Sequence, residues 1–179
     1  MTPSERQRPS LTGPGTEFDG APDAHVQDAV RVALCYLNRR DRTVSETWRH
    51  LAHRDFDAGA IQGAVGGLAA DGYLDDARYA RLFAEDKRNL DRWGAGRIRR
   101  ALLERGIDPE LVEATLAAHE GGDEELRQAV LLLRRRFPSP PTTRRDRDRA
   151  LGLLLRRGYD DELALQALTA YGAERSSDA

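Results

Sequence analysis

A short pattern that ends one helix and starts the next occurs three times and constrains the fold more than any other feature. It reads Leu-Ala-His-Arg-Asp-Phe-Asp at residues 51–57, Leu-Leu-Glu-Arg-Gly-Ile-Asp at 102–108 and Leu-Leu-Arg-Arg-Gly-Tyr-Asp at 154–160. Each copy runs from an apolar anchor through a helix-stop position to an aspartate suited to cap the following helix. A period of about 52 residues predicts tandem helical repeats, and units of this size must share buried surface with their neighbours.

Apolar residues recur at helical spacing between these patterns, and no stretch alternates as a β-strand does. Abundant Ala, Leu and Arg favour helix, and a charged fraction of 32% indicates much surface for little core. We therefore predict an all-α fold of three tandem three-helix modules in an elongated, curved array. The helices are expected near residues 23–39, 44–54, 57–71, 76–90, 93–105, 108–119, 122–137, 142–157 and 160–171.

The same patterns place the domain boundaries. The three modules are predicted at residues 23–72, 73–120 and 121–172. Residues 1–22 contain four Pro and three Gly without a hydrophobic period, which predicts a disordered tail, with Asp23 as the first helix cap. Residues 173–179 are predicted to be a disordered C-terminus.

Adjacent carboxylates are the first candidates for chemistry, because such pairs can act as acid/base couples or metal ligands. The pairs are Asp75 with Asp76, Glu124 with Glu125, and Asp160 with Asp161. Neighbouring residues at a helix start point to different sides, so we favour helix capping.

His50, His53 and Cys35 are the other candidates. The two histidines stand at i and i+3 without a third ligand nearby, so an exposed helix face is favoured over a metal site. Cys35 lacks a neighbouring base, and a buried apolar thiol is favoured over a nucleophile. We predict no catalytic residue, no metal and no cofactor, and hence a protein that is not an enzyme.

Arginines are distributed unevenly, although the formal net charge is only −2. Residues 127–157 hold ten arginines against two aspartates, a local excess typical of anion-binding surfaces. The candidate partner-binding residues are Arg97, Arg99, Arg100, Arg134, Arg135, Arg136, Arg144, Arg145, Arg147 and Arg149. The last four lie at the start of a predicted helix, where positive charge opposes the helix dipole. We therefore favour contact of these arginines with phosphate or an acidic protein over a solvated face.

The segment joining the first two modules is interpreted as mainly structural. It contains Gly72, Tyr73, Leu74, Asp75, Asp76, Tyr79 and Ala80. Its glycine can end a helix with positive φ, and either aspartate can cap the next helix. Tyr73 and Leu74 are expected to pack across the module boundary, and Tyr79 to face the core beside Phe83 at i+4.

This segment resembles the most recognisable motif of the RecX family, Gly-aromatic-aliphatic-Asp/Asn-Asp-x-x-aromatic-Ala. Residues 93–107, which include the helix-stop Gly106, resemble the family's Gly-x-x-Arg-Ile-x-x-x-Leu-x-x-(Arg/Lys)-Gly-Ile. Residues 33–42 resemble its Ala-Leu-x-Leu-Leu-x-x-Arg-x-Arg, and the likeness extends over residues 23–172. The pattern departs at Thr47, where the family has Leu, and at Asp55, where it has Gly.

The resemblance implies a regulator of homologous recombination that binds the RecA filament on single-stranded DNA. It further implies that the protein mainly inhibits the filament's ATPase and strand exchange. Single-stranded DNA is a second expected partner, and we expect a cytoplasmic monomer without membrane association. The alternatives are a sequence-tolerant DNA-binding protein and a helical scaffold for another protein; pull-down with recombinase filament and with bare single-stranded DNA distinguishes them.

Overall fold

The computed structural model describes residues 22–118 and 122–176. The disordered tail predicted at residues 1–22 lies outside these ranges except for Pro22, which is helical. Of the C-terminus predicted to be disordered at 173–179, the last three residues lie outside the described ranges, but residues 173–176 are helical, so that part of the prediction was wrong.

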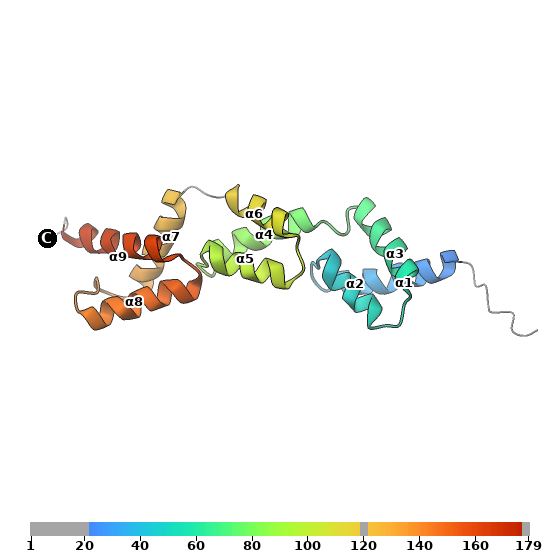
Figure 1. The fold of residues 1–179 in the computed structure, drawn as a ribbon, viewed down its shortest axis with the longest axis horizontal. Coiled ribbons are helices and arrows are strands. Elements are labelled where there is room, and N and C mark those ends of the chain that lie inside the picture. The colour runs from blue at the N-terminus through green and yellow to red at the C-terminus, as the bar shows by residue number, and fades with distance from the viewer. Residues whose placement is uncertain (1–21, 119–121, 177–179) are drawn as a thin grey trace, which may run out of the picture.

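The described residues form helices connected by turns and loops, without a strand, which confirms the all-α prediction. The helices are α1 (Pro22–Leu37), α2 (Val44–Ala52), α3 (Ala58–Ala70), α4 (Asp76–Asn89), α5 (Ala95–Glu104), α6 (Pro109–Ala117), α7 (Gly122–Arg136), α8 (Arg144–Arg157) and α9 (Asp161–Ser176). Figure 1 shows them as three groups of three in an elongated row, with α1–α3 at one end and α7–α9 at the other.

Each group of three helices encloses its own hydrophobic core. The third helix of a module packs along the first and also contacts the second. Leu51, Leu102 and Leu154, the apolar anchors of the repeated pattern, are fully buried at the corresponding place in the three cores. The period in the sequence therefore reflects a repeated packing position.

The helix caps follow the sequence pattern. Asp57, Asp108 and Asp160 each accept a backbone N–H from the first turn of α3, α6 and α9, with N–O distances of 2.7–3.3 Å. Asp75 caps α4 through the Arg78 amide at 2.8 Å. Thr43 caps α2 and forms a reciprocal capping box with Glu46.

The three helix-stop positions all adopt the left-handed conformation. Asp55 has a φ of 63°, Gly106 of 77° and Gly158 of 90°. Gly72, which follows α3, has a φ of 76°. Asp55 shows that this conformation does not by itself require glycine, since aspartate tolerates it better than most residues.

Three expectations about local structure were wrong. Helix α1 begins at Pro22, one residue before the expected cap Asp23, because proline fits the first helical position. Helix α9 continues to Ser176 instead of ending near 171, because Gly172 stays helical rather than reversing the chain. Tyr73 is exposed instead of packing across the module boundary, whereas Leu74 does cross it and is buried in the core of the first module.

Two glycines inside α3 offer a test of the helix energetics. A Cβ added at Gly66 or Gly67 would meet no atom within 4 Å. Gly66→Ala and Gly67→Ala should therefore each raise the free energy of unfolding by up to about 1 kcal/mol, through helix propensity alone. Chemical denaturation measures this change.

Gly63→Ala is the matched control, because its Cβ would lie 3.1 Å from Cγ2 of Val26 in α1. The free energy of unfolding should rise less for Gly63→Ala than for the other two variants. Equal stabilisation at all three positions would contradict the close packing of α1 on α3.

Candidate interaction surface and the junctions between modules

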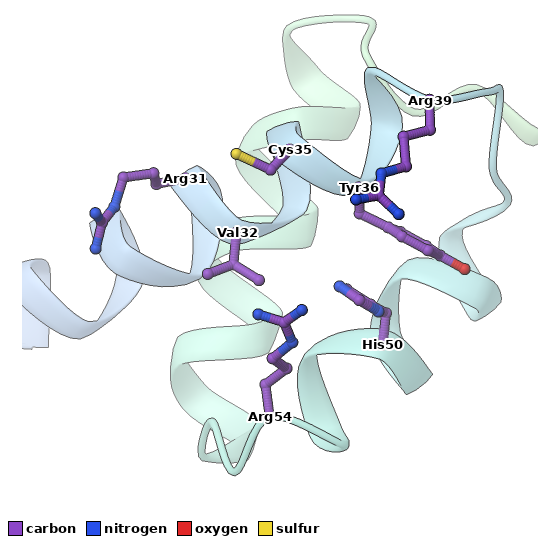
Figure 2. A pocket seen from close by; sticks show the side chains of 7 residues that line it. All are labelled: Arg31, Val32, Cys35, Tyr36, Arg39, His50 and Arg54. Atoms are coloured by element: carbon purple, nitrogen blue, oxygen red, sulfur yellow. The ribbon is translucent and has the colours of Figure 1, made fainter.

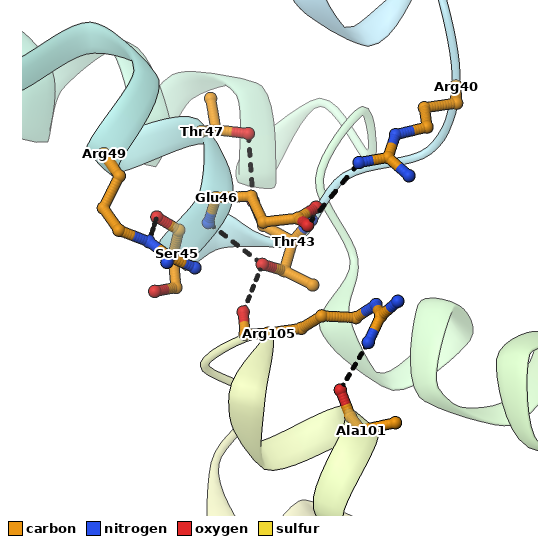
Figure 3. Close-up of polar contacts among 8 residues, drawn as sticks. All are labelled: Arg40, Thr43, Ser45, Glu46, Thr47, Arg49, Ala101 and Arg105. Carbon is orange, nitrogen blue, oxygen red and sulfur yellow. Dashed lines mark hydrogen bonds and ion pairs between the residues drawn. The ribbon is translucent and has the colours of Figure 1, made fainter. Parts of the chain in front are cut away.

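The first and second modules meet where the start of α2 reaches the end of α5. The Thr43 hydroxyl donates to the carbonyl of Arg105 at 2.8 Å, as Figure 3 shows. The adjacent amide of Val44 donates to Oδ1 of Asp76, in the first turn of α4, at 2.9 Å. Two groups at the start of α2 are thus satisfied by the following module.

The second and third modules meet in the same way. The amides of Gly94 and Gly96, at the start of α5, donate to the carbonyls of Arg157 and Gly158 at 2.8 and 3.0 Å. The Ala95 amide donates to Oε1 of Glu125, in the first turn of α7, at 2.9 Å. Each junction therefore joins one middle helix to the next and uses a carboxylate of the following module's first helix.

The two junctions leave no room for side chains at the helix-stop glycines. A Cβ on Gly158 would lie 2.3 Å from the backbone nitrogen of Arg97, and one on Gly106 would lie 2.3 Å from Oγ of Ser45. Asp55 occupies the corresponding position of the first module and is exposed. Glycine is thus present where a preceding module packs on the turn.

The paired carboxylates were predicted to cap helices, and this prediction was only partly correct. Asp75 and Asp160 do cap their helices, but Asp76 and Glu125 accept hydrogen bonds from a different module. Burial raises the pKa of Asp76 above its usual range, and the nearby charges of Asp75 and Glu46 raise it further. The Val44 amide opposes this shift by stabilising the ionised form.

The structure brings four arginines together on one side of α8. Arg144, Arg145, Arg149 and Arg156 line an open hollow of about 670 Å³ together with Asp148. We name these four residues the α8 basic face. Arg156 was not among the predicted candidates, although its spacing of seven residues from Arg149 places both on the same side of a helix.

Arg147 belongs to a different side of α8. Its Nε donates to the carbonyl of Pro141 at 3.3 Å, and the residue lines a separate groove with Leu151 and Leu165. Thr143 caps α8 through the Asp146 amide, and Asp146 lies 3.7 Å from the Arg149 guanidinium. The four arginines predicted at the start of α8 therefore do not form one surface.

The remaining candidate arginines are in different environments. Arg99 forms a bidentate ion pair with Glu113 at 2.6 and 2.8 Å, so it links α5 to α6. Arg97 stacks on Trp93 and donates to the carbonyl of Arg156 at 3.3 Å, next to the α8 basic face. Arg100 is exposed, and so are the three arginines that end α7, where they complement the helix dipole: Arg134, Arg135 and Arg136.

Two predictions about the first module were wrong. Cys35 is exposed rather than buried. His50 does not lie on a freely exposed helix face; it is half-buried and stacks on Tyr36 with ring centroids 3.9 Å apart. Cys35 stays exposed at a cleft between α1 and α2, whereas His50 is half-buried because Tyr36 of α1 packs on it. Periodicity within one helix reveals neither contact.

Within the part of the chain that is described, no three His, Cys, Asp or Glu side chains gather in a way that could hold a metal ion. None of the described helices combines the length and apolar character needed to cross a lipid bilayer.

Known proteins resemble this chain over most of its length. Residues 75–116 match the family model for the second three-helix domain of RecX. The regulatory protein RecX of Leptothrix cholodnii is 33% identical over 146 residues, which cover 82% of this chain and 90% of that protein. The chain belongs to the RecX family. RecX of Xanthomonas axonopodis pv. citri is 36% identical over 149 residues, covering 83% and 90%.

A shorter stretch of the chain has a higher identity to another relative. RecX of Lactobacillus delbrueckii subsp. bulgaricus is 41% identical over 86 residues, but the match covers only 48% of this chain and 32% of that longer protein. The crystal structure of RecX from Lactobacillus salivarius superposes with a TM-score of 0.74 at 20% identity, covering 83% of this chain and 97% of that one. This likeness shows that the RecX fold is shared.

Because the modules pack closely on the helix-stop glycines, we expect a side chain at these positions to disturb the junctions. Gly158→Ala places a Cβ against the Arg97 backbone, so it should both destabilise the protein and separate the second and third modules. Small-angle scattering should show a changed radius of gyration.

Gly72→Ala is the matched control, since Gly72 also has positive φ but has open space around it. It should cost only the strain of a left-handed alanine, about 1–2 kcal/mol, and leave the scattering unchanged. Equal losses of stability and unchanged scattering in both variants would show that the junction tolerates a side chain.

A second prediction concerns the carboxylate at the first junction. The folded-state pKa of Asp76 is raised, so its protonation favours the folded state; this contribution is complete below pH 3.8 and is lost as the pH rises through the raised value. Asp76→Asn keeps the acceptor and removes the charge. It should be at least as stable as the wild type near pH 7, and this advantage should shrink on acidification.

Thermal unfolding of both proteins from pH 7 to pH 3 measures that difference. Asp76→Ala, which removes the acceptor, should be less stable than Asp76→Asn at every pH. A stability difference between wild type and Asp76→Asn that is independent of pH would contradict the raised pKa.

Proposed function

We propose that this RecX protein is a non-enzymatic regulator of homologous recombination that binds the RecA filament on single-stranded DNA. It mainly inhibits the filament's ATP hydrolysis and strand exchange. The observation that carries the proposal is the 33–36% identity to RecX regulatory proteins over about nine-tenths of their length. It acts as a monomer in the cytoplasm, where the genome and its recombinase are found, and requires no cofactor.

The elongated array supports this mode of action. Three modules in a row present their surfaces along a line, as Figure 1 shows, and a filament presents repeated sites along a line. Successive modules then contact successive parts of the filament, so that the combined affinity exceeds that of any single module.

The α8 basic face is the proposed contact for an anionic surface of the filament. Its arginines are exposed, and the positive charge of Arg144 and Arg145 at the start of α8 opposes the helix dipole. An anionic partner, phosphate or carboxylate, offsets that unfavourable charge.

Single charge reversals on α8 test this contact. Arg145→Glu should raise the concentration needed for half-maximal inhibition of the RecA ATPase by about tenfold or more, because breaking a desolvated charge pair costs about 2–5 kcal/mol. The assay uses the cognate recombinase on single-stranded DNA, with the regulator below one molecule per RecA subunit.

Arg147→Glu is the matched control, because it makes the same charge change on the same helix but on another side. It should inhibit like the wild type, and circular dichroism should be unchanged for both variants. If wild-type protein at saturation leaves ATP hydrolysis unaffected, the proposed function fails; if both reversals inhibit normally, the contact lies elsewhere.

A further inference from the structure

A cleft between α1 and α2 in the first module combines arginines with an aromatic stack. It has a volume of about 330 Å³ and is lined by Arg31, Val32, Cys35, Tyr36, Arg39, His50 and Arg54. Figure 2 shows Val32 and Cys35 on the α1 side of the opening, with His50 and Arg54 facing them from α2 and the turn after it.

The aromatic side chains form a layered stack. The rings of Tyr36 and His50 are 3.9 Å apart and inclined by only 4°. The guanidinium of Arg42 lies 4.1 Å from the centre of the Tyr36 ring. The imidazole occupies one face of the Tyr36 ring and the Arg42 guanidinium covers the other. Both rings line the cleft, so a flat ring bound there would pack against the imidazole of His50.

The charge around the stack is positive. None of the described residues lining the cleft is acidic, and Arg31, Arg39 and Arg54 are exposed. Arg31 is paired with Asp28 at 2.8 Å, whereas Arg39 and Arg54 make no ion pair with any described residue. The pKa of His50 is lowered, mainly by burial and then by the charges of Arg54 and Arg42. These charges favour an anionic occupant.

We infer that this cleft binds one nucleotide of a single-stranded nucleic acid, with its base against His50 and its phosphate between Arg39 and Arg54. Stacking on an aromatic ring beside arginines is how proteins hold unpaired bases, since every base offers a flat face. An acidic peptide would use the arginines but leave the ring face uncovered. A duplex hides its base faces, so the site is specific for single strands.

This site is separate from the one in the proposed function. The cleft belongs to the first module and the α8 basic face to the third, at opposite ends of the row in Figure 1. Nucleotide binding at the cleft requires no recombinase, so it can be tested on the purified protein alone.

Cys35 reports directly on this cleft, because it lines the opening, is exposed and is the only cysteine in the sequence. The rate of its alkylation by a neutral reagent is measured with and without a short oligothymidylate. Alkylation should slow by about tenfold when the oligonucleotide is present at about ten times its Kd. An oligonucleotide of the same length with abasic sites should protect much less, because it lacks the ring that stacks.

Arg54→Glu and Arg39→Glu should each abolish this protection, while Arg81→Glu, an equal charge change at an exposed site on α4, should retain it. Circular dichroism checks that each variant folds. Equal protection by abasic and thymidine oligonucleotides would overturn the stacking site, and equal protection by a polyglutamate peptide would assign the cleft to acidic proteins. Unchanged alkylation at saturating oligothymidylate would also overturn the inference.

Discussion

The hydrogen bonds between consecutive middle helices determine how this protein is built. The start of α2 and the start of α5 both leave backbone amides without a partner inside their own helix. A carboxylate of the next module's first helix accepts one such amide at each start. The end of the next middle helix supplies carbonyls, which accept the Thr43 hydroxyl at α2 and the amides of Gly94 and Gly96 at α5. Each of these hydrogen bonds contributes about 0.5–1.5 kcal/mol relative to hydration by water, so several together favour docked modules.

The same junctions explain which helix-stop residues must be glycine. Gly106 and Gly158 allow the backbone of the preceding module to approach closely, and the exposed Asp55 has no such neighbour. We propose that contacts repeated at each step hold the α8 basic face and the cleft beside His50 at a fixed separation, as simultaneous contact with an extended partner requires.

Much of the fold could be predicted from the sequence because the signals are local. Helix stops at Gly106 and Gly158 and caps at Asp57 and Asp108 involve residues only a few positions apart, so the repeated pattern locates them. Tyr79 and Phe83 lie on the same side of α4, as their spacing predicts, and their rings stack 6.0 Å apart.

The candidate sites were predicted less well because their partners are distant in the chain. Arg99 has the same local character as Arg100, yet α6 brings Glu113 to it. Asp76 is indistinguishable from a capping residue until the amide of Val44 is seen beside it. Cys35 fits an apolar helix face by spacing, but α2 does not cover that part of α1. Local pattern identifies helices, and only tertiary packing identifies which charges remain available.

The distance between the first and third modules tests most directly whether the junctions fix the array. Spin labels on the native Cys35 and on Leu165→Cys, an exposed position of α9, report this distance by pulsed electron resonance. Rigid junctions predict one narrow distance distribution in solution, which broadens when Gly158→Ala opens the second junction. A broad distribution in the protein with unaltered junctions would show that the modules move independently and would contradict a fixed array.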